Sequence, residues 1–163
     1  MDKSLLLTEI KNNFSHKINS ISEPYGLLTI EIEKEEIKAL IVFLKTNLGF
    51  AFLTDICGIH YPENQGKELG VIYHLHNLES NIRVRLKTFF SMENAEVDTI
   101  TDLFLGANWM ERETFDFYGI RFKGHPDLRV ILNDENLGYH PMLKQYRLED
   151  ETREDKDDSM FGR

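Results

Sequence analysis

The chain has 163 residues, of which 41% are hydrophobic and 29% are charged, a composition typical of a soluble globular domain with its own core. Its formal net charge of −9 repels phosphate groups, so we expect no general nucleic-acid binding. The single cysteine cannot form an intramolecular disulfide or hold an iron–sulfur cluster alone, and no apolar run is long enough to span a bilayer, so we expect membrane contact only through partner proteins.

The first 49 residues predict a helix, a strand and a second helix. Apolar side chains recur at helical spacing up to Phe14, after Ser4 as a candidate N-cap. Residues 28–32 alternate between apolar and polar side chains, as in a half-buried strand. A longer apolar stripe over residues 37–48 indicates the second helix, which Gly49 ends.

Three strand-like runs follow, over residues 50–61, 69–78 and 82–90, with turn-forming residues between them. A short helix is predicted over residues 97–105. The order α-β-α-β-β-β-α-α, completed by a last helix, predicts an α+β fold with a mostly antiparallel sheet packed by helices.

The last predicted helix begins at Asn108, a favourable N-cap with Glu111 three residues further on, and it ends at Gly119. We expect residues 1–119 to form the α+β domain. Residues 120–148 lack regular periodicity and contain glycines and prolines, so we interpret them as an extended partner-binding segment. Residues 149–163 are charged and predict an acidic, mobile tail.

Three histidines on neighbouring strands suggest a metal site, but their surroundings oppose it. His60, His74 and His76 could meet if the strand register allowed it. If Val71, Tyr73 and Leu75 instead form the core face, the other face carries Arg83, Arg85 and Lys87 beside two of the histidines. Cations disfavour a divalent metal, so this face is expected to be solvated and basic, or to contact an acidic or anionic partner.

Carboxylate or thiol catalysis is not favoured by the pattern of charged residues. Arg112 and Asp116 are four residues apart on one helix, a spacing that commonly forms a helix-supporting ion pair. No carboxylate follows a pattern that isolates it in an apolar pocket and raises its pKa, as a general acid needs. Cys57 falls within an apolar alternation typical of a buried, unreactive thiol. We therefore predict no catalytic, cofactor-binding or metal-binding residue.

The last helix and the segment after it have features of a protein interface. A helical projection puts Met110, Thr114 and Phe117 on the core side of the helix. A different side carries one aromatic and three charged residues, as interfaces often do: Trp109, Arg112, Glu113 and Asp116. Trp109 either anchors a partner or stacks on Arg112 at the edge of its own domain. Residues 124–129 and 138–144 each place a His-Pro pair before an apolar residue and a cation, either as an extended ribbon or as two ordinary turns.

Together, three stretches resemble the C-subunit family of the proton-pumping NADH:quinone oxidoreductase, respiratory complex I. They are Glu111-Arg112-Glu113, Asp116-Phe117-Tyr118-Gly119-Ile120 and the run from Phe122 to Leu132 that reads FKGHPDLRVIL. The family usually has a second arginine at the position of Val130. Its second motif normally reads Gly-His-Pro-Leu-Arg-Lys, where this chain has Gly138-Tyr139-His140-Pro141-Met142-Leu143-Lys144.

The resemblance implies a non-redox, structural and assembly subunit of the hydrophilic arm, peripheral on the cytoplasmic face of the bacterial inner membrane. It would pack on the D subunit near the quinone site, beside the cluster-bearing B and I subunits. NADH, FMN, iron–sulfur clusters and quinone would act in the assembled complex, which couples quinone reduction to proton translocation, and this chain would bind no cofactor.

Two alternatives remain open. One is the equivalent subunit of a membrane-bound hydrogenase or of a ferredoxin- or F420-linked complex, and the other is a free-standing enzyme that uses His125 or Glu113. Under the complex I interpretation, the expected partner-interface residues are Trp109, Arg112, Glu113, Asp116, His125, Pro126, Asp127, Arg129, His140 and Pro141.

Overall fold

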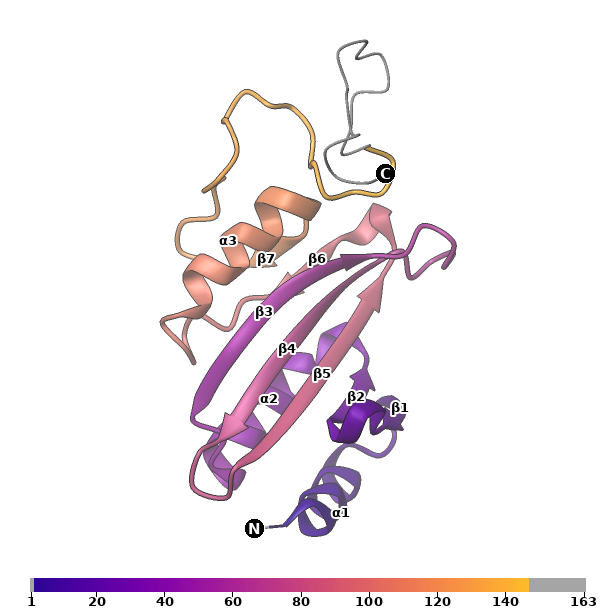
Figure 1. Cartoon of the computed structure of the whole chain (residues 1–163), viewed down its shortest axis with the longest axis vertical. Helices are drawn as coiled ribbons and strands as arrows, with labels where there is room; N and C mark the ends of the chain where they lie inside the picture. The colour runs from indigo at the N-terminus through magenta and orange to yellow at the C-terminus, as the bar shows by residue number, and fades with distance from the viewer. Residues whose placement is uncertain (1, 147–163) are drawn as a thin grey trace, which may run out of the picture.

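A five-stranded sheet forms the centre of the structure, a computed structural model that describes residues 2–146 (Figure 1). The strand order is β1-β2-β5-β4-β3, and every neighbouring pair is antiparallel except β2 and β5. The predicted α+β class with a mostly antiparallel sheet is therefore confirmed. The strands are β1 (Ile18–Ser22), β2 (Leu28–Ile32), β3 (Phe52–His60), β4 (Leu69–Asn77) and β5 (Ile82–Phe90).

The register of β4 and β5 separates a buried face from an outer face. Val71, Tyr73 and Leu75 are fully buried, and the cations of β5 alternate with buried residues and point to the other side. His60 lies in phase with the buried face, whereas His74 and His76 lie on the outer face. The three histidines therefore do not gather, and within residues 2–146 no group of three metal-binding side chains is present.

Helices α1 (Lys3–Phe14) and α2 (Lys34–Leu48) contribute to the core through their apolar stripes. Phe14 of α1 packs edge-on against Phe43 of α2, with 5.6 Å between ring centroids. The predicted N-cap of α1 is wrong, because Asp2 rather than Ser4 accepts the hydrogen bond from the Leu5 backbone N–H. Gly49 ends α2 with φ 71°, as the sequence predicts.

The predicted helix over residues 97–105 is wrong. Val97 lies in β6 (Glu96–Asp98), a short strand that pairs in parallel with β7 (Arg121–Lys123). The turns after β6 are fixed by α2, where Lys38 forms an ion pair with Asp102 and Lys45 donates to the Leu103 carbonyl. Two short 3-10 helices, η1 (Pro24–Gly26) and η2 (Met92–Asn94), complete the connections.

Helix α3 (Ala107–Tyr118) begins one residue before the predicted N-cap, and Gly106 at the cap position makes no side-chain cap bond. Gly119 ends α3 with φ 76°, as predicted. Ile120 and Phe122 are buried in the core, so the chain leaves the fold only after β7. Residues 124–146, called the C-terminal segment below, then run past α3 without regular structure (Figure 1).

The predicted acidic tail, residues 149–163, lies outside the described residues. Among residues 2–146, no helix combines the length and the apolar character that crossing a bilayer requires.

Candidate partner interface

Asp116, near the end of α3, fixes the backbone of the C-terminal segment. Its Oδ2 accepts hydrogen bonds from the backbone N–H groups of Ile131, Leu132 and Asn133 at 3.1, 2.8 and 3.0 Å, and its Oδ1 accepts from Asn133 Nδ2 at 2.9 Å. Burial alone would raise the pKa of this carboxyl group, but the four hydrogen bonds outweigh burial and lower the pKa to about 2. Asp116 is therefore an anion that holds three consecutive residues in place.

Arg112, one turn earlier on α3, holds the adjacent backbone. Its Nε donates to the Arg129 carbonyl at 3.1 Å, and its Nη2 donates to the Val130 carbonyl at 3.0 Å. Its side chain lies under the segment, and only 7% of the residue is exposed. Instead of pairing with each other, Arg112 and Asp116 thus bind opposite kinds of backbone group along residues 129–133.

The two His-Pro motifs attach the segment to opposite ends of α3. Near the start of α3, His125 Nδ1 accepts from the Asp127 N–H at 3.0 Å, so its Nε2–H donates to the Asn108 carbonyl at 3.2 Å. Near the end of α3, His140 Nδ1 lies 2.9 Å from the Asp116 carbonyl, which it can reach only as a donor. The repeated motif therefore has a structural role that two ordinary turns would not have.

A further contact joins the end of the segment to the sheet. The Lys144 backbone N–H donates to His60 Nδ1 at 3.0 Å, and Leu143 is buried beside it. Burial is the main cause that lowers the pKa of His60, which suits a neutral ring that accepts this bond. The sequence gives no sign of this contact, because the two residues are 84 positions apart.

The predicted faces of α3 need correction. Arg112 and Asp116 do not lie on a solvent-exposed side, since Asp116 is only 2% exposed and the segment covers both. Thr114 is buried as predicted, whereas Met110 and Phe117 are only partly buried. The helical projection groups these residues correctly but cannot reveal that a later part of the same chain covers the charged side.

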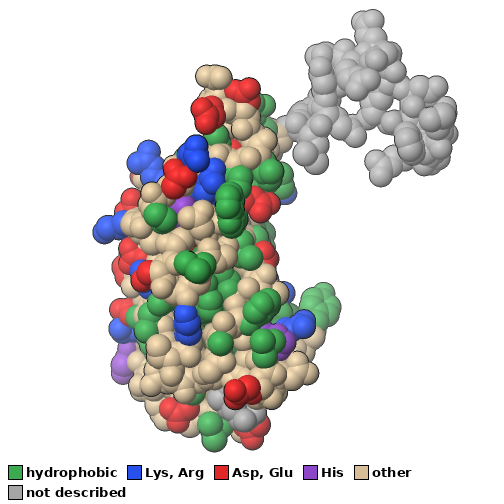
Figure 2. Space-filling model, turned by 90° about the vertical axis from the view of Figure 1, so that its left-hand side faces the viewer, with side chains coloured by type: hydrophobic (Ala, Val, Ile, Leu, Met, Phe, Trp, Pro, Cys, Tyr) green, Lys and Arg blue, Asp and Glu red, His purple; other side chains and the backbone are tan. Residues whose placement is uncertain are grey.

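Trp109 satisfies one predicted contact and leaves most of its surface exposed. Its ring stacks on the Arg112 guanidinium, 5.3 Å from ring centroid to Cζ, and 61% of the residue is exposed. Glu113, Pro126, Asp127 and Arg129 are exposed as well. Figure 2 shows this side of the molecule, where hydrophobic side chains lie among charged ones.

Large apolar side chains of the C-terminal segment also point away from the fold. Leu132 is 65% exposed although three hydrogen bonds hold its backbone and that of its neighbours. The Tyr139 ring packs at a tilt of 40° against the Tyr146 ring, with 4.6 Å between ring centroids, and both remain exposed. Exposed apolar groups on a fixed backbone are characteristic of an interface anchor.

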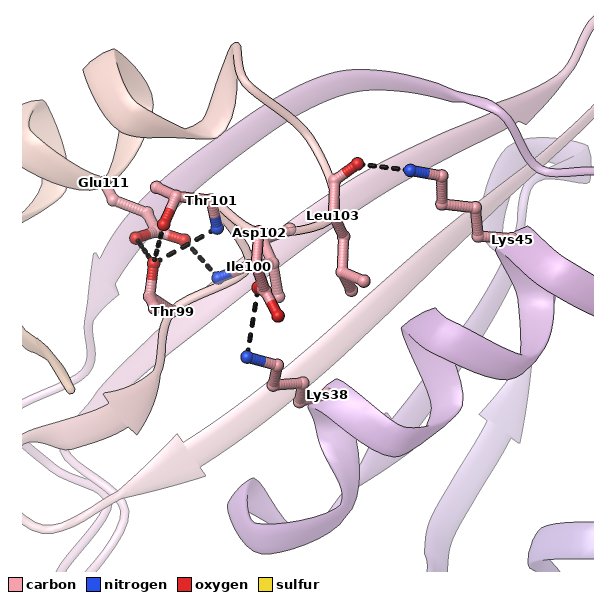
Figure 3. A network of polar contacts seen from close by, with 8 residues as sticks. All are labelled: Lys38, Lys45, Thr99, Ile100, Thr101, Asp102, Leu103 and Glu111. Atoms are coloured by element: carbon pink, nitrogen blue, oxygen red, sulfur yellow. Dashed lines mark hydrogen bonds and ion pairs between the residues drawn. The ribbon is translucent and has the colours of Figure 1, made fainter. Parts of the chain in front are cut away.

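Glu111 contradicts the prediction that no carboxylate is isolated by burial (Figure 3). It is fully buried at the inner side of α3, where its Oε2 accepts from Thr99 Oγ1 at 2.5 Å and its Oε1 accepts from the Ile100 N–H at 2.8 Å. Burial raises its pKa to about 7, although the two hydrogen bonds act in the opposite direction. Glu111 links α3 to the turns after β6 and is fully shielded from solvent.

Cys57 is half-buried rather than buried, because a bulge between Leu53 and Asp55 shifts the alternation of β3. It lines a cleft of about 200 Å³ between β3 and α3, together with Asp55, Glu113 and Tyr118. Burial, followed by the charge of Asp55, raises its pKa to about 11. The thiol is therefore protonated near neutral pH and a poor nucleophile or metal ligand.

The comparisons of the sequence with known proteins identify one family. Residues 30–152 match the profile of the family "Respiratory-chain NADH dehydrogenase, 30 Kd subunit". The C subunit of an NADH-quinone oxidoreductase from Mesorhizobium japonicum is 37% identical over 147 residues, which cover 89% of this chain and 72% of that protein. The corresponding C subunit from Xanthobacter autotrophicus is 40% identical over 124 residues, which cover 75% of this chain and only 58% of the relative.

Two solved structures share the fold. A trypsin-resistant fragment of Nqo5 superimposes with a TM-score of 0.69 and 31% identity, covering 78% of this chain and all of the fragment. The membrane-bound sulfane sulfur reductase, an archaeal respiratory membrane complex, contains a chain with a TM-score of 0.74 and 21% identity, covering 89% of this chain and 85% of that one. The profile match extends over most of the chain, through α3 and the C-terminal segment, so this chain belongs to the 30 kDa (C-subunit) family of the respiratory-chain NADH dehydrogenases.

Proposed function

We propose that this chain is a non-redox, structural subunit of the hydrophilic arm of an NADH:quinone oxidoreductase, and that α3 with the C-terminal segment is its main partner-binding surface. The observation that carries the proposal is the way Arg112 and Asp116 fix residues 129–133 while Trp109 and Leu132 stay exposed. An interface gains affinity when its anchors are ordered before binding, because less conformational entropy is lost on association.

We further propose that NADH, FMN, the iron–sulfur clusters and quinone are bound by other subunits of the assembled complex. The sequence has one cysteine, and burial raises its pKa to about 11, whereas a cluster ligand must be a thiolate. This chain would then support electron transfer and proton translocation by holding its neighbours in position.

The D subunit is the partner that we propose for the α3 surface, with the B and I subunits adjacent to it and the quinone site nearby. The chain would lie at the cytoplasmic face of the bacterial inner membrane and contact the membrane only through the complex. The interface residues predicted from the sequence divide into two roles under this proposal. Trp109, Glu113, Pro126, Asp127, Arg129 and Pro141 would contact the partner, while Arg112, Asp116, His125 and His140 would hold the segment in its binding conformation.

Co-purification from gently solubilised membranes of the source organism tests this function. The tagged chain is expected to elute with the D subunit, the cluster-bearing subunits and NADH-dependent quinone reduction. Elution with a hydrogenase module, or with a ferredoxin-linked one, would instead assign the chain to a related complex. Recovery of the chain alone, with enzymatic activity of its own, would contradict a scaffold role.

A Trp109→Ala variant tests the surface itself. We expect the amount of partner subunits recovered to fall roughly tenfold or more relative to the unmodified chain. Truncating a central aromatic anchor commonly costs about 2 kcal/mol or more of binding free energy. The thermal midpoint of the isolated chain should change little, since the ring is mostly exposed. Leu78→Ala is the matched control, because Leu78 is 63% exposed and lies in the turn between β4 and β5, away from α3.

A further inference from the structure

The outer face of the sheet forms an ordered ladder of side chains that the α3 surface does not include. Cross-strand register puts Ile72 beside Lys87, His74 beside Arg85 and His76 beside Arg83. In Figure 1, α2 lies behind β4 and β5, and no helix lies in front of them. Among residues 2–146, no helix covers this face (Figure 1), which is basic although the protein as a whole is acidic.

The cations of this face are oriented but not neutralised. Arg85 Nε donates to His74 Nε2 at 2.9 Å, so His74 is neutral with its proton on Nδ1, which lies 3.7 Å from Asp55. Burial, followed by the charge of Arg85, lowers the pKa of His74, in agreement with this protonation state. His74 thus fixes Arg85 through one nitrogen and leaves the two terminal guanidinium nitrogens available to a ligand.

Two carboxylates lie beside this row but do not pair with its cations. Glu31, the register neighbour of Lys87 on β2, lies 3.6 Å from Lys67, and Asp55 lies near His74. Within residues 2–146, no carboxylate oxygen comes within 4 Å of the charged nitrogens of Arg83, Arg85 or Lys87. These cations form a row along β5 with a net positive charge.

An apolar patch lies at one end of this row. Phe89 packs over Gly70, where an added Cβ would lie 2.5 Å from its ring, and its ring centroid is 6.1 Å from that of Tyr61. Ile59 and Ile72 are half-buried next to them. A ligand for this face would therefore carry negative charges along most of its length and an apolar group at one end.

We propose that the outer face of β4 and β5 is a docking surface for an extended, acidic segment of a partner protein. Side chains on one side of an extended chain repeat every ~6.8 Å, which is also the spacing of alternate residues along β5. Such a segment would lie along β5 with alternate carboxylates at Arg83, Arg85 and Lys87. This docking surface is separate from the one at α3 on which the proposed function rests.

A nucleic acid or an anionic bilayer fits this face less well. The net charge of −9 repels a polyphosphate at long range, and one row of three cations is narrow for a flat bilayer surface. A short acidic peptide segment needs only the local row, and its own charge density is low enough to approach an acidic protein.

Carbodiimide cross-linking of the complex purified through this chain tests the proposal, because the reagent joins an amine to a carboxylate only when the two are in contact. We expect mass spectrometry to find Lys87 linked to an aspartate or glutamate of another subunit. An Arg83→Glu variant should release that subunit at roughly half the salt concentration needed for the unmodified chain. Lys11→Glu on the exposed side of α1 is the charge-matched control and should have no such effect.

Three results would overturn this proposal. Lys87 could link only to acidic residues of this chain, Arg83→Glu could leave salt-dependent retention unchanged, or a single-stranded RNA or anionic vesicles could bind the complex in an Arg83-dependent way without any link to a protein carboxylate. Recovery of the chain without any partner would instead count against the proposed function, so the two failures are distinguishable.

Discussion

Glu111 is fully buried, and each of its carboxylate oxygens accepts one hydrogen bond from the turn that begins at Thr99. The ion pair between Lys38 and Asp102 lies nearby (Figure 3). A folded-state pKa of about 7, against 4.5 for an ordinary glutamate, means that the folded chain binds a proton more tightly than the unfolded chain. This residue therefore couples the stability of the α3 junction to pH.

Because the folded state has the higher pKa, the contribution of Glu111 to stability decreases as the pH rises. The stabilising effect is fully present below pH 4.5 and is lost as pH rises through about 7, at up to about 1.4 kcal/mol per pH unit. Glu111→Gln keeps a neutral side chain at every pH, so its stability relative to the unmodified chain should increase between pH 5 and about pH 7 and then level off. Urea unfolding at several pH values measures the difference.

Glu113→Gln, on the exposed side of the same helix, is the control for the loss of one charge. Its stability relative to the unmodified chain should stay constant over the same pH range. A parallel pH dependence in the two variants would show that the effect comes from overall charge rather than from the buried carboxyl group.

At the scale of elements, the junction between α3 and β7 combines two requirements in one residue. Gly119 has φ 76°, and a Cβ at this position would lie 2.6 Å from the His140 ring. The positive φ requires a residue that tolerates the left-handed backbone conformation, and the nearby ring requires a residue without a Cβ. Gly119 therefore both ends α3 and leaves room for the His140 ring of the C-terminal segment.

Gly119→Ala should therefore destabilise the chain and also displace His140. An alanine in the left-handed conformation lowers the free energy of unfolding by about 1 kcal/mol, and the clash with the His140 ring lowers it further. Gly66→Ala is a control for the backbone effect alone, because Gly66 also has a positive φ of 78° but nothing lies within 4 Å of the added carbon. Limited proteolysis should cut residues 138–146 faster in Gly119→Ala than in Gly66→Ala, and equal cleavage rates would show that the His140 contact does not hold the segment.

The long elements were predictable from sequence because each has several periods of its own pattern. The apolar stripe of α2 indicates its buried face, and the structure confirms it. For β4 and β5 the sequence offers a core face with Val71, Tyr73 and Leu75 as one of two alternatives, and the structure has this one. The three-residue strands β6 and β7 have no such pattern, since each depends on a partner more than 20 residues away. Asn108 has good capping chemistry, but the helix begins before it and Glu111 turns to the core instead.

The candidate interface was predictable in its residues but not in their arrangement. Charge and aromatic content identify Trp109, Arg112 and Asp116 as neighbours on α3. Their environment depends on residues 129–133, which fold back over the helix through backbone groups that every residue possesses. No side-chain pattern encodes that contact, so the sequence suggests a surface for another protein where the structure has the chain's own segment.

At the scale of the whole molecule, the structure has three parts with different roles. The sheet with α1 and α2 provides the core, α3 carries the charged residues, and the C-terminal segment displays apolar groups that those residues hold in place. Under the proposed function, assembly depends on how well the C-terminal segment is ordered before the partner binds, as well as on the groups that contact the partner. Variants of α3 can separate these two contributions.

Asp116→Asn should loosen the segment while leaving the core intact. The amide can no longer accept all four hydrogen bonds, and bonds to a charged group are worth about 1.5–3 kcal/mol each, so the amide hydrogens of residues 131–133 should exchange roughly tenfold or more faster. Recovery of partner subunits should fall together with this loss of order. Trp109→Ala should weaken recovery without changing exchange. Glu63→Gln, which removes an exposed carboxylate from the connection between β3 and β4, should change neither strongly. Faster exchange in Asp116→Asn with undiminished assembly would mean that the order of the C-terminal segment does not matter for binding, and that the partner contacts lie elsewhere on the chain.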